Sequence, residues 1–527
     1  MKYHLFALLA LFLFQSCSEV APIDPANDAI KEVETNLTTQ VYIKGDATWS
    51  IEERMEHYGV PGVSIAVIHN GEIAWAKAYG IMDKESKFPV TKETLFQAAS
   101  ISKPVTAYGA LTLVEQGKVD LNEDINTYLE SWKLPKNEFT EAKTVTLKNL
   151  LNHSAGVTVH GFLGYSPGLP VPSLVEVLNG TLPANSGAIF VDKTPEESYR
   201  YSGGGYNIIQ QMMIDVEAKT FPEIMKELVL QPLGMDHSTY DQPLEGDDLK
   251  MAPTGYLPDG SMTKGKRHTY PEMAPAGLWT TAEDLAQFAI AIQEGLKGDS
   301  EKGLSQNMTA TMLTPFVEDF TGLGIFLKES KGDIYFEHGG WNEGFSSQLV
   351  AHKDKGYGVV VMTNSNHPDF ISELIRSVAL TYEWDNYFSV YEELEVAQSV
   401  FSTIGGRYIA NGNEVVEILE LDGELLVKKA PWEDPMDLIK VSDTTFVTRE
   451  NSSLIQFIPS SETESMDLVI REDGRRAIRS TYTKMGADEK VPMELLMEGD
   501  FDAAMEAMLA LKKEDPNNPL VSEGNLN

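Results

Sequence analysis

Cysteine is almost absent from this sequence: the 527 residues include one, Cys17. A single thiol cannot form a disulfide within the chain, so the fold has to be held by its own core. Basic residues are also scarce, with 42 Lys and Arg against 79 Asp and Glu and a net charge of -37. A chain without a basic surplus has little with which to neutralise phosphates. The composition therefore argues against nucleic acid as a partner.

Long hydrophobic runs are missing as well. The apolar run from Leu5 to Phe14 is too short to span a membrane and has the length of a signal-peptide core, so we expect residues 1–16 to be a signal peptide. The stretch that ends in Cys17 resembles a bacterial lipobox, which predicts a lipid on Cys17 and a polar tether over residues 17–45. The alternative is an ordinary secretion signal with an incidental cysteine. Either way we expect an exported protein, and the lipid would make it a periplasmic or outer-membrane-anchored lipoprotein.

Metal and cofactor patterns are lacking too. The ten histidines are scattered, and neither His-Glu-x-x-His nor paired cysteines occur. The glycine-rich segment "YSGGGYN" (201–207) lacks the strand-turn-helix setting of a nucleotide-binding loop. We therefore expect no metal and no cofactor, and we interpret these glycines as room for a turn.

The remaining sequence patterns predict an α+β domain over residues 46–390. Two β-rich runs meet at Asn70-Gly71, a strong hairpin signal, and helical spacing follows from Ser100. Residues from about 122 to 250 show helices and loops, which suggests a helical insertion. A helix capped by Thr281 and a meander of strands complete the region. We expect an antiparallel sheet flanked by helices.

The remaining sequence changes character. Residues 391–484 form short alternating runs with Asp-Gly turns at Asp422-Gly423 and Asp473-Gly474, which predicts a small β-sandwich or lipocalin-like domain. Residues 485–527 switch to a helical pattern broken at Gly499-Asp500. This tail is similar to half of a tetratricopeptide-like repeat, and such a unit has to pack on other structure.

Ser100 and Lys103 are three residues apart at the start of an apolar helical pattern. A serine hydroxyl is a poor nucleophile until a base takes its proton, and a buried lysine near a helix start can have its pKa lowered enough to be that base. The same spacing occurs at Ser261 and Lys264, but that segment is turn-rich and opens no amphipathic helix. The first pair is therefore the candidate for catalysis.

Three motifs in order, "QAASISK", "YRYSGGGYN" and "FEHGGWNEGF", resemble those of the class C β-lactamase-like serine hydrolases, a family that includes penicillin-binding-protein-like members, D-amino-acid-specific peptidases and esterases. The resemblance covers residues 50–380 or so and implies their fold, with a large sheet and helical insertion. It implies that Ser100 is the acylated nucleophile and that Lys103 takes its proton. It also implies that Tyr201 passes a proton to the leaving group.

The third motif supplies the other wall of the implied site. His338, Gly339 and Gly340 match the family's edge strand, where glycines let a substrate approach closely. The backbone amides of Ser100 and Trp341 would form the oxyanion hole. These residues define a substrate-binding surface for a small molecule or peptide.

Two positions depart from the β-lactamases of this type. Gly203 stands where many carry an asparagine that binds the amide on the acyl side of the substrate, and His338 stands where they usually have lysine. Both changes favour an esterase or D-stereospecific peptidase over an efficient β-lactamase. The alternative is a non-catalytic sensor or binding protein on the same fold; it would be expected to have lost Ser100, Lys103 or Tyr201. The oligomeric state and the natural substrate stay open.

Overall fold

A computed structural model describes residues 25–299, 302–430, 433–450, 453–461, 465–472, 478–515 and 518. The predicted signal peptide and Cys17 lie outside these residues. No helix within these ranges is both long and apolar enough to cross a bilayer. The centre of the larger domain is a six-stranded sheet in the order β3-β2-β9-β8-β7-β6, with every neighbouring pair antiparallel. Its strands are β2 (Gly62–His69), β3 (Glu72–Gly80), β6 (Phe326–Ser330), β7 (Asp333–Asn342), β8 (Phe345–His352) and β9 (Gly358–Thr363).

The predicted hairpin is confirmed at β2 and β3. Asn70 and Gly71 both adopt positive φ, at 56° and 80°, as the tightest hairpin turns require. The pairing brings both ends of the region together, because β2 also pairs with β9. Two neighbouring strands of the sheet are thus about 300 positions apart in sequence, in the α+β arrangement that was expected.

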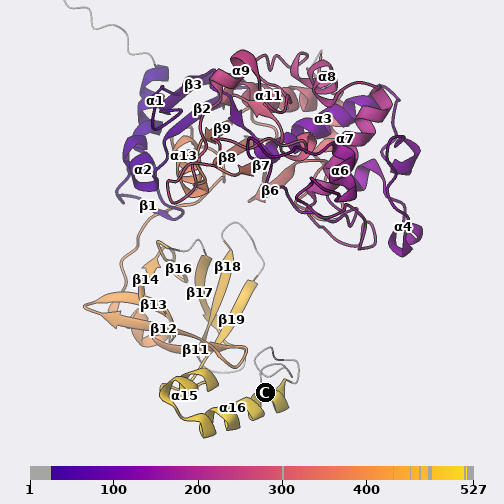
Figure 1. Cartoon of the computed structure of the whole chain (residues 1–527). Helices are drawn as coiled ribbons and strands as arrows, with labels where there is room; N and C mark the ends of the chain where they lie inside the picture. The colour runs from indigo at the N-terminus through magenta and orange to yellow at the C-terminus, as the bar shows by residue number, and fades with distance from the viewer. Residues whose placement is uncertain are drawn as a thin grey trace, which may run out of the picture.

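Helices cover both faces of this sheet (Figure 1). One face packs on α1 (Pro25–Thr35), α2 (Ile51–Tyr58) and α13 (Pro368–Thr381), with Val63, Ile65 and Val67 pointing toward them. The other face, with Ala66 and Ile68, packs on α11 (Ala282–Lys297), and the core continues through α3 (Ser102–Glu115) and α12 (Gln306–Met312). Helix α3 is buried nearly all round, as expected for a helix that is apolar on every side.

The described elements between β4 (Phe96–Gln97) and β5 (Trp279–Thr280) are helices and connecting loops. These two short strands pair with each other. Strands of two residues are too short to be predicted from the sequence. Besides α3, the intervening helices are η1 (Ala99–Ile101), η2 (Ile125–Thr127), α4 (Glu138–Ala142), α5 (Leu147–Leu151), α6 (Leu174–Asn179), α7 (Gly203–Glu217), α8 (Phe221–Met225), η3 (Lys226–Leu230), α9 (Gly246–Met251) and α10 (Met273–Ala276).

Residues 25–45 differ from the predicted tether, because they are packed on the larger domain. Helix α1 buries Val33, and Leu37 just beyond it is also buried. The Ser377 hydroxyl of α13 donates a hydrogen bond to the carbonyl of Val33, at 2.7 Å. Strand β1 (Tyr42–Ile43) then pairs in parallel with β10 (Val390–Tyr391). An apolar helical spacing within a charged segment explains the difference.

The C-terminal domain is all-β, as expected. In the described part of this domain the strands pair in the order β14-β13-β12-β11-β19-β18-β17-β16-β15, and Leu438 alone lies between β14 and β15 in the sequence. The sheet therefore curls back on itself like a barrel. Asp422 and Gly423 make the predicted turn with positive φ, whereas Asp473-Gly474 lies outside the described residues. The elements are α14 (Gln398–Ile404), β11 (Gly406–Ala410), β12 (Glu414–Leu421), β13 (Glu424–Ala430), β14 (Met436–Asp437), β15 (Ile439–Lys440), β16 (Thr445–Val447), β17 (Ser453–Pro459), β18 (Met466–Glu472) and β19 (Ile478–Lys484).

The helical tail is a hairpin of α15 (Pro492–Glu498) and α16 (Phe501–Glu514) that lies against this barrel (Figure 1). Gly499 ends the first helix in a left-handed conformation, and the Asp500 side chain caps the second. Arg407 of β11 pairs with Glu494 of α15 at 2.5 Å, and Val491 packs on Val415. The tail thus packs on the same chain.

A buried ion pair joins α2 to α13 and gives a test of stability. Arg54 donates two hydrogen bonds of 2.6 Å to the Glu373 carboxylate, which also accepts one from the Tyr58 hydroxyl at 2.9 Å. We expect Arg54→Met to lower the free energy of unfolding by about 3–5 kcal/mol, because it leaves a buried carboxylate unpaired. The Arg54→Met/Glu373→Met double variant should recover most of that loss. Chemical denaturation measures both, and equal losses in the two variants would contradict this account.

Candidate active site

Ser100 lies in a short 3-10 turn (Ala99–Ile101) that leads into α3, not in the helix itself. Ala99 adopts a left-handed φ of 49°, which is unusual for a residue with a side chain and marks local strain of the kind found at functional sites. Neighbouring groups hold the turn: the Ser102 hydroxyl donates to the Ala99 carbonyl at 2.6 Å, and the Ser347 hydroxyl donates to the Ala98 carbonyl at 3.1 Å. The nucleophile candidate is therefore presented from a fixed turn.

Lys103 lies one turn further on, with its amine directed at Ser100. The Nζ atom is 3.1 Å from the Ser100 hydroxyl oxygen and donates to the Pro275 carbonyl of α10 at 2.9 Å. The residue is only 2% exposed, and burial lowers the pKa of its amine to about 7. A lysine with this pKa is substantially neutral at physiological pH, so it can accept the proton of the serine.

Tyr201 precedes α7, and its aromatic ring packs beside the Lys103 amine. The Nζ atom lies 4.8 Å from the ring centroid. Burial raises the pKa of the Tyr201 hydroxyl above its ordinary value, and its interaction with Ser100 offsets only part of that rise. The hydroxyl therefore stays protonated at neutral pH and is able to donate.

The glycines after Tyr201 form the first turn of α7, which corrects the expected loop turn. The Ser202 side chain caps this helix by accepting a hydrogen bond from the Gly205 amide at 2.9 Å. The Gly203 and Gly204 amides instead donate to the carbonyls of His160 and Val159, both at 3.0 Å. The glycines thus allow a neighbouring segment to lie directly on the helix.

Two histidines on that side were not predicted. His153 stacks on Tyr201 with ring centroids 4.3 Å apart, and its Nδ1 accepts a hydrogen bond from the Ser202 amide at 3.1 Å. Burial lowers the pKa of His153 well below its ordinary value, so it is neutral. The His160 ring also packs on Tyr201, with ring centroids 4.9 Å apart. The sequence around His153 contains no pattern that predicts its contact with the tyrosine.

His338 occupies the opposite wall, on β7. Its Nδ1 is 2.7 Å from the Gly339 carbonyl oxygen, which can only accept, so Nδ1 carries the proton and Nε2 is left as an acceptor. Burial lowers the pKa of His338 to about 3, and Lys103 nearby adds to this shift. This position therefore presents a neutral acceptor, which cannot hold a substrate carboxylate as a lysine would.

The rest of the third motif meets the nucleophile turn. A side chain at Gly340 would come within 2.1 Å of the Ala98 carbonyl oxygen, so only glycine lets β7 approach this closely. Strand β6 pairs with β7 only as far as Glu337, and further along β7 Trp341 lines the same cavity as Ser100. The Asn342 side chain donates to Gln97 at 2.9 Å, which ties β7 to β4 beneath the site.

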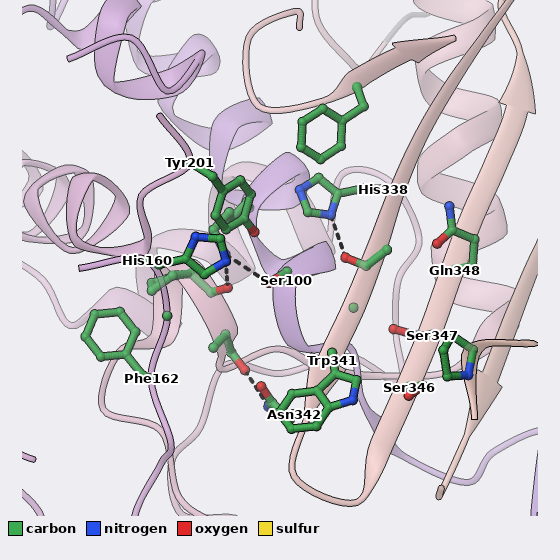
Figure 2. A pocket seen from close by; sticks show the side chains of 18 of the residues that line it. Ser100, His160, Phe162, Tyr201, His338, Trp341, Asn342, Ser346, Ser347 and Gln348 are labelled. Atoms are coloured by element: carbon green, nitrogen blue, oxygen red, sulfur yellow. Dashed lines mark hydrogen bonds between the residues drawn. The ribbon is translucent and has the colours of Figure 1, made fainter. Parts of the chain in front are cut away.

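These residues surround one cavity of about 870 Å³. Figure 2 shows Tyr201 and His160 beside Ser100, with His338 facing them from β7. All eight residues assigned to the catalytic, oxyanion and substrate-binding roles come to this region, and all but Gly203 line the cavity directly. Its described lining contains one lysine and no arginine, aspartate or glutamate. A cavity of this kind favours an uncharged substrate.

The second Ser-x-x-Lys pair is a surface turn. Ser261 is exposed and its hydroxyl donates to Asp259 at 2.6 Å, and Lys264 is exposed too. Within the described residues, no group of three or more His, Cys, Asp or Glu side chains is placed to share a metal ion.

The fold thus brings a serine, a lysine and a tyrosine together at one cavity. The family model "Beta-lactamase" matches residues 50–383, and the chain belongs to this family. "Protein flp" of Staphylococcus aureus (strain N315) is 25% identical over 336 residues, which span 62% of this chain and 64% of that protein, just under two thirds of its length.

Solved structures share the fold. The octameric penicillin-binding protein homologue from Pyrococcus abyssi has a TM-score of 0.54 at 21% identity and covers 82% of this chain and 98% of its own. The D-amino acid amidase from Ochrobactrum anthropi SV3 has a TM-score of 0.53 at 21% identity and covers 68% and 99%. The first likeness extends beyond the residues of the family match, so it includes part of the C-terminal region.

Proposed function

We propose that this protein is a serine hydrolase that works through an acyl-enzyme on an uncharged ester or amide. The observation that supports it most directly is the Lys103 amine, 3.1 Å from the Ser100 hydroxyl in a buried setting that lowers its pKa to about 7. A nucleophile within hydrogen-bond reach of a base whose pKa lies near the working pH is the minimum that acyl transfer requires.

In the first half-reaction, the Ser100 oxygen attacks the substrate carbonyl carbon while Lys103 takes its proton. The amides of Ser100 and Trp341 would stabilise the oxyanion that forms. Tyr201 then gives its proton to the leaving oxygen or nitrogen as that bond breaks, and it regains one from Lys103. In the second half-reaction, water attacks the acyl-enzyme, its proton passes back through the same groups, and Ser100 is released with the acid product.

The substrate is proposed to be an ester, or an amide or peptide with an uncharged group near the reacting bond, in preference to a penicillin. A penicillin carries a carboxylate, and His338 offers that carboxylate a lone pair in place of a cation. The relatives named above include a D-amino acid amidase, so amides of D-amino acids belong among the candidates to be tested.

The test uses the purified protein with a fluorophosphonate, a short-chain activated ester and a penicillin. We expect the fluorophosphonate to modify Ser100, because it reports a nucleophile with a working base, and we expect turnover of the ester with slow or no turnover of the penicillin. Intact mass and peptide mapping locate the adduct. Folded protein without an adduct would favour a non-catalytic binding protein, and fast penicillin turnover would contradict the reading of His338.

A further inference from the structure

Phe162 occupies the space beside Gly203, at the edge of the cavity (Figure 2). A Cβ atom on Gly203 would lie 2.9 Å from Cε2 of the Phe162 ring and 3.1 Å from the His160 carbonyl oxygen. Gly203 does not have a left-handed φ, so its backbone could accept another residue. A longer side chain is therefore excluded by the ring and the carbonyl, and not by backbone strain.

The geometry points to Phe162 as a specificity-determining residue: we propose that it selects substrates whose acyl group is apolar and carries no amide next to the reacting carbonyl. This inference rests on the proposed acyl-enzyme function. Gly203 matches the family position that binds an acyl-side amide, and in this chain the volume available to that amide-binding side chain is filled by a hydrocarbon ring. An aromatic wall thus replaces a hydrogen-bonding one.

The ring is held in position by the loop that bears it. The Leu163 carbonyl accepts hydrogen bonds from His268 Nδ1 at 2.9 Å and from the Tyr270 hydroxyl at 3.3 Å. At Gly164, a side chain would come within 2.6 Å of the Tyr270 ring, so the loop lies directly on that residue. The Tyr165 amide then bonds to the Thr269 carbonyl at 2.8 Å. On the other side of Phe162, the His160 carbonyl accepts a hydrogen bond from the Gly203 amide at 3.0 Å, so the backbone that carries the ring is anchored on both sides.

The rest of the wall is of the same chemical kind. Phe326 stacks on His338 with ring centroids 5.0 Å apart, and Tyr199 and the exposed Leu163 line the cavity as well. A substrate amide placed against the hydrocarbon side chains of Phe162 and Leu163 would give up its hydrogen bonds to water and gain none from them. An alkyl group in the same place would be removed from water at no such cost. The wall therefore discriminates against the amide.

Two matched pairs of esters test this. Ethyl pentanoate and ethyl N-acetylglycinate have acyl chains of equal length that differ by an amide, and pentyl acetate and 2-acetamidoethyl acetate place the same difference in the alcohol. We expect kcat/KM to favour ethyl pentanoate over ethyl N-acetylglycinate by about 10- to 100-fold. Phe162→Ala should reduce that preference about tenfold and leave the ratio within the alcohol pair unchanged.

Variants at Gly203 probe the steric coupling. Gly203→Asn should lose activity on every ester, because the asparagine meets the ring, whereas Phe162→Ala/Gly203→Asn should recover activity and lower the preference for ethyl pentanoate further. Phe88→Ala is the matched control, since Phe88 is 67% exposed and lies outside the cavity, and it should leave all ratios unchanged.

Fluorophosphonate titration of each preparation counts the working sites and separates two failures. A wild-type protein that is not labelled at Ser100 would overturn the proposed function and this inference with it. A labelled protein whose acyl-side preference is absent, is unchanged in Phe162→Ala, or shifts in the alcohol pair instead would overturn the role of Phe162 alone. A pH-stat follows the hydrolysis of each ester, and peptide mapping locates the fluorophosphonate label.

Discussion

Replacement of Ser100 by alanine is expected to lower kcat/KM on any substrate by at least about 10⁴-fold. The change removes the oxygen that forms the acyl-enzyme, and the remaining groups cannot supply another nucleophile at that position. The turn around Ala99 holds Ser100 in place, and its hydroxyl contacts the Lys103 amine at the cavity. The fold should therefore be unaffected, and thermal denaturation should show the same transition as in the wild type.

Steady-state kinetics and the fluorophosphonate adduct measure this effect together. Ser261→Ala is the matched control, because Ser261 has the same spacing to a lysine but lies in an exposed turn. We expect this control to keep full activity and full labelling. Near-normal turnover in Ser100→Ala would remove Ser100 from the role of nucleophile.

Replacement of Lys103 by methionine should have the second largest effect, a loss of about 10²- to 10⁴-fold in the acylation rate. The wild-type rate should fall as the pH drops below about 7, because the amine can accept a proton only in its neutral form. The methionine variant has no such group, so its residual rate should lack this acidic limb. A pH profile of kcat/KM measures both. Lys264→Met, in the exposed second pair, should keep the wild-type profile.

The same lysine gives a second, independent readout in stability. Burial lowers its pKa from 10.5 to about 7, so between these values the unfolded chain holds a proton on Lys103 that the folded chain does not. The free energy of unfolding contributed by this group therefore rises with pH across this window and is lowest below about pH 7. Lys103→Met should remove that slope. If the variant keeps the same slope, another group causes the pH dependence of stability.

Much of this site could be predicted because its key residues lie within short sequence motifs. Ser100 and Lys103 share one helical start, and the hairpin at Asn70-Gly71 is determined by the local φ angles that its turn requires. The ordered motifs then placed Tyr201 and His338 in one site. Local chemistry and motif order were enough for each of these.

The remaining features depend on contacts between segments far apart. Strands β4 and β5 contain two residues each, so their pairing has no periodicity to detect. The roles of His153 and Phe162 depend on where the fold places them. An isolated ring in a loop is more readily interpreted as a core residue. The glycines from Gly203 were misread as a turn because the close approach of His160 is invisible in sequence.

Apart from Ser100, the hydrogen-bond partner of the catalytic amine is the main-chain carbonyl of Pro275, which no side-chain substitution removes. The wall at Phe162, in contrast, is a single side chain on a separately anchored loop. If the proposals hold, the groups that transfer protons and the side chain that selects the acyl group lie on different segments of the chain. Substitutions in the loop that bears Phe162 would then change the preferred substrate while the proton-transfer groups stay in place. The enzyme could acquire new substrates through variants that remain active.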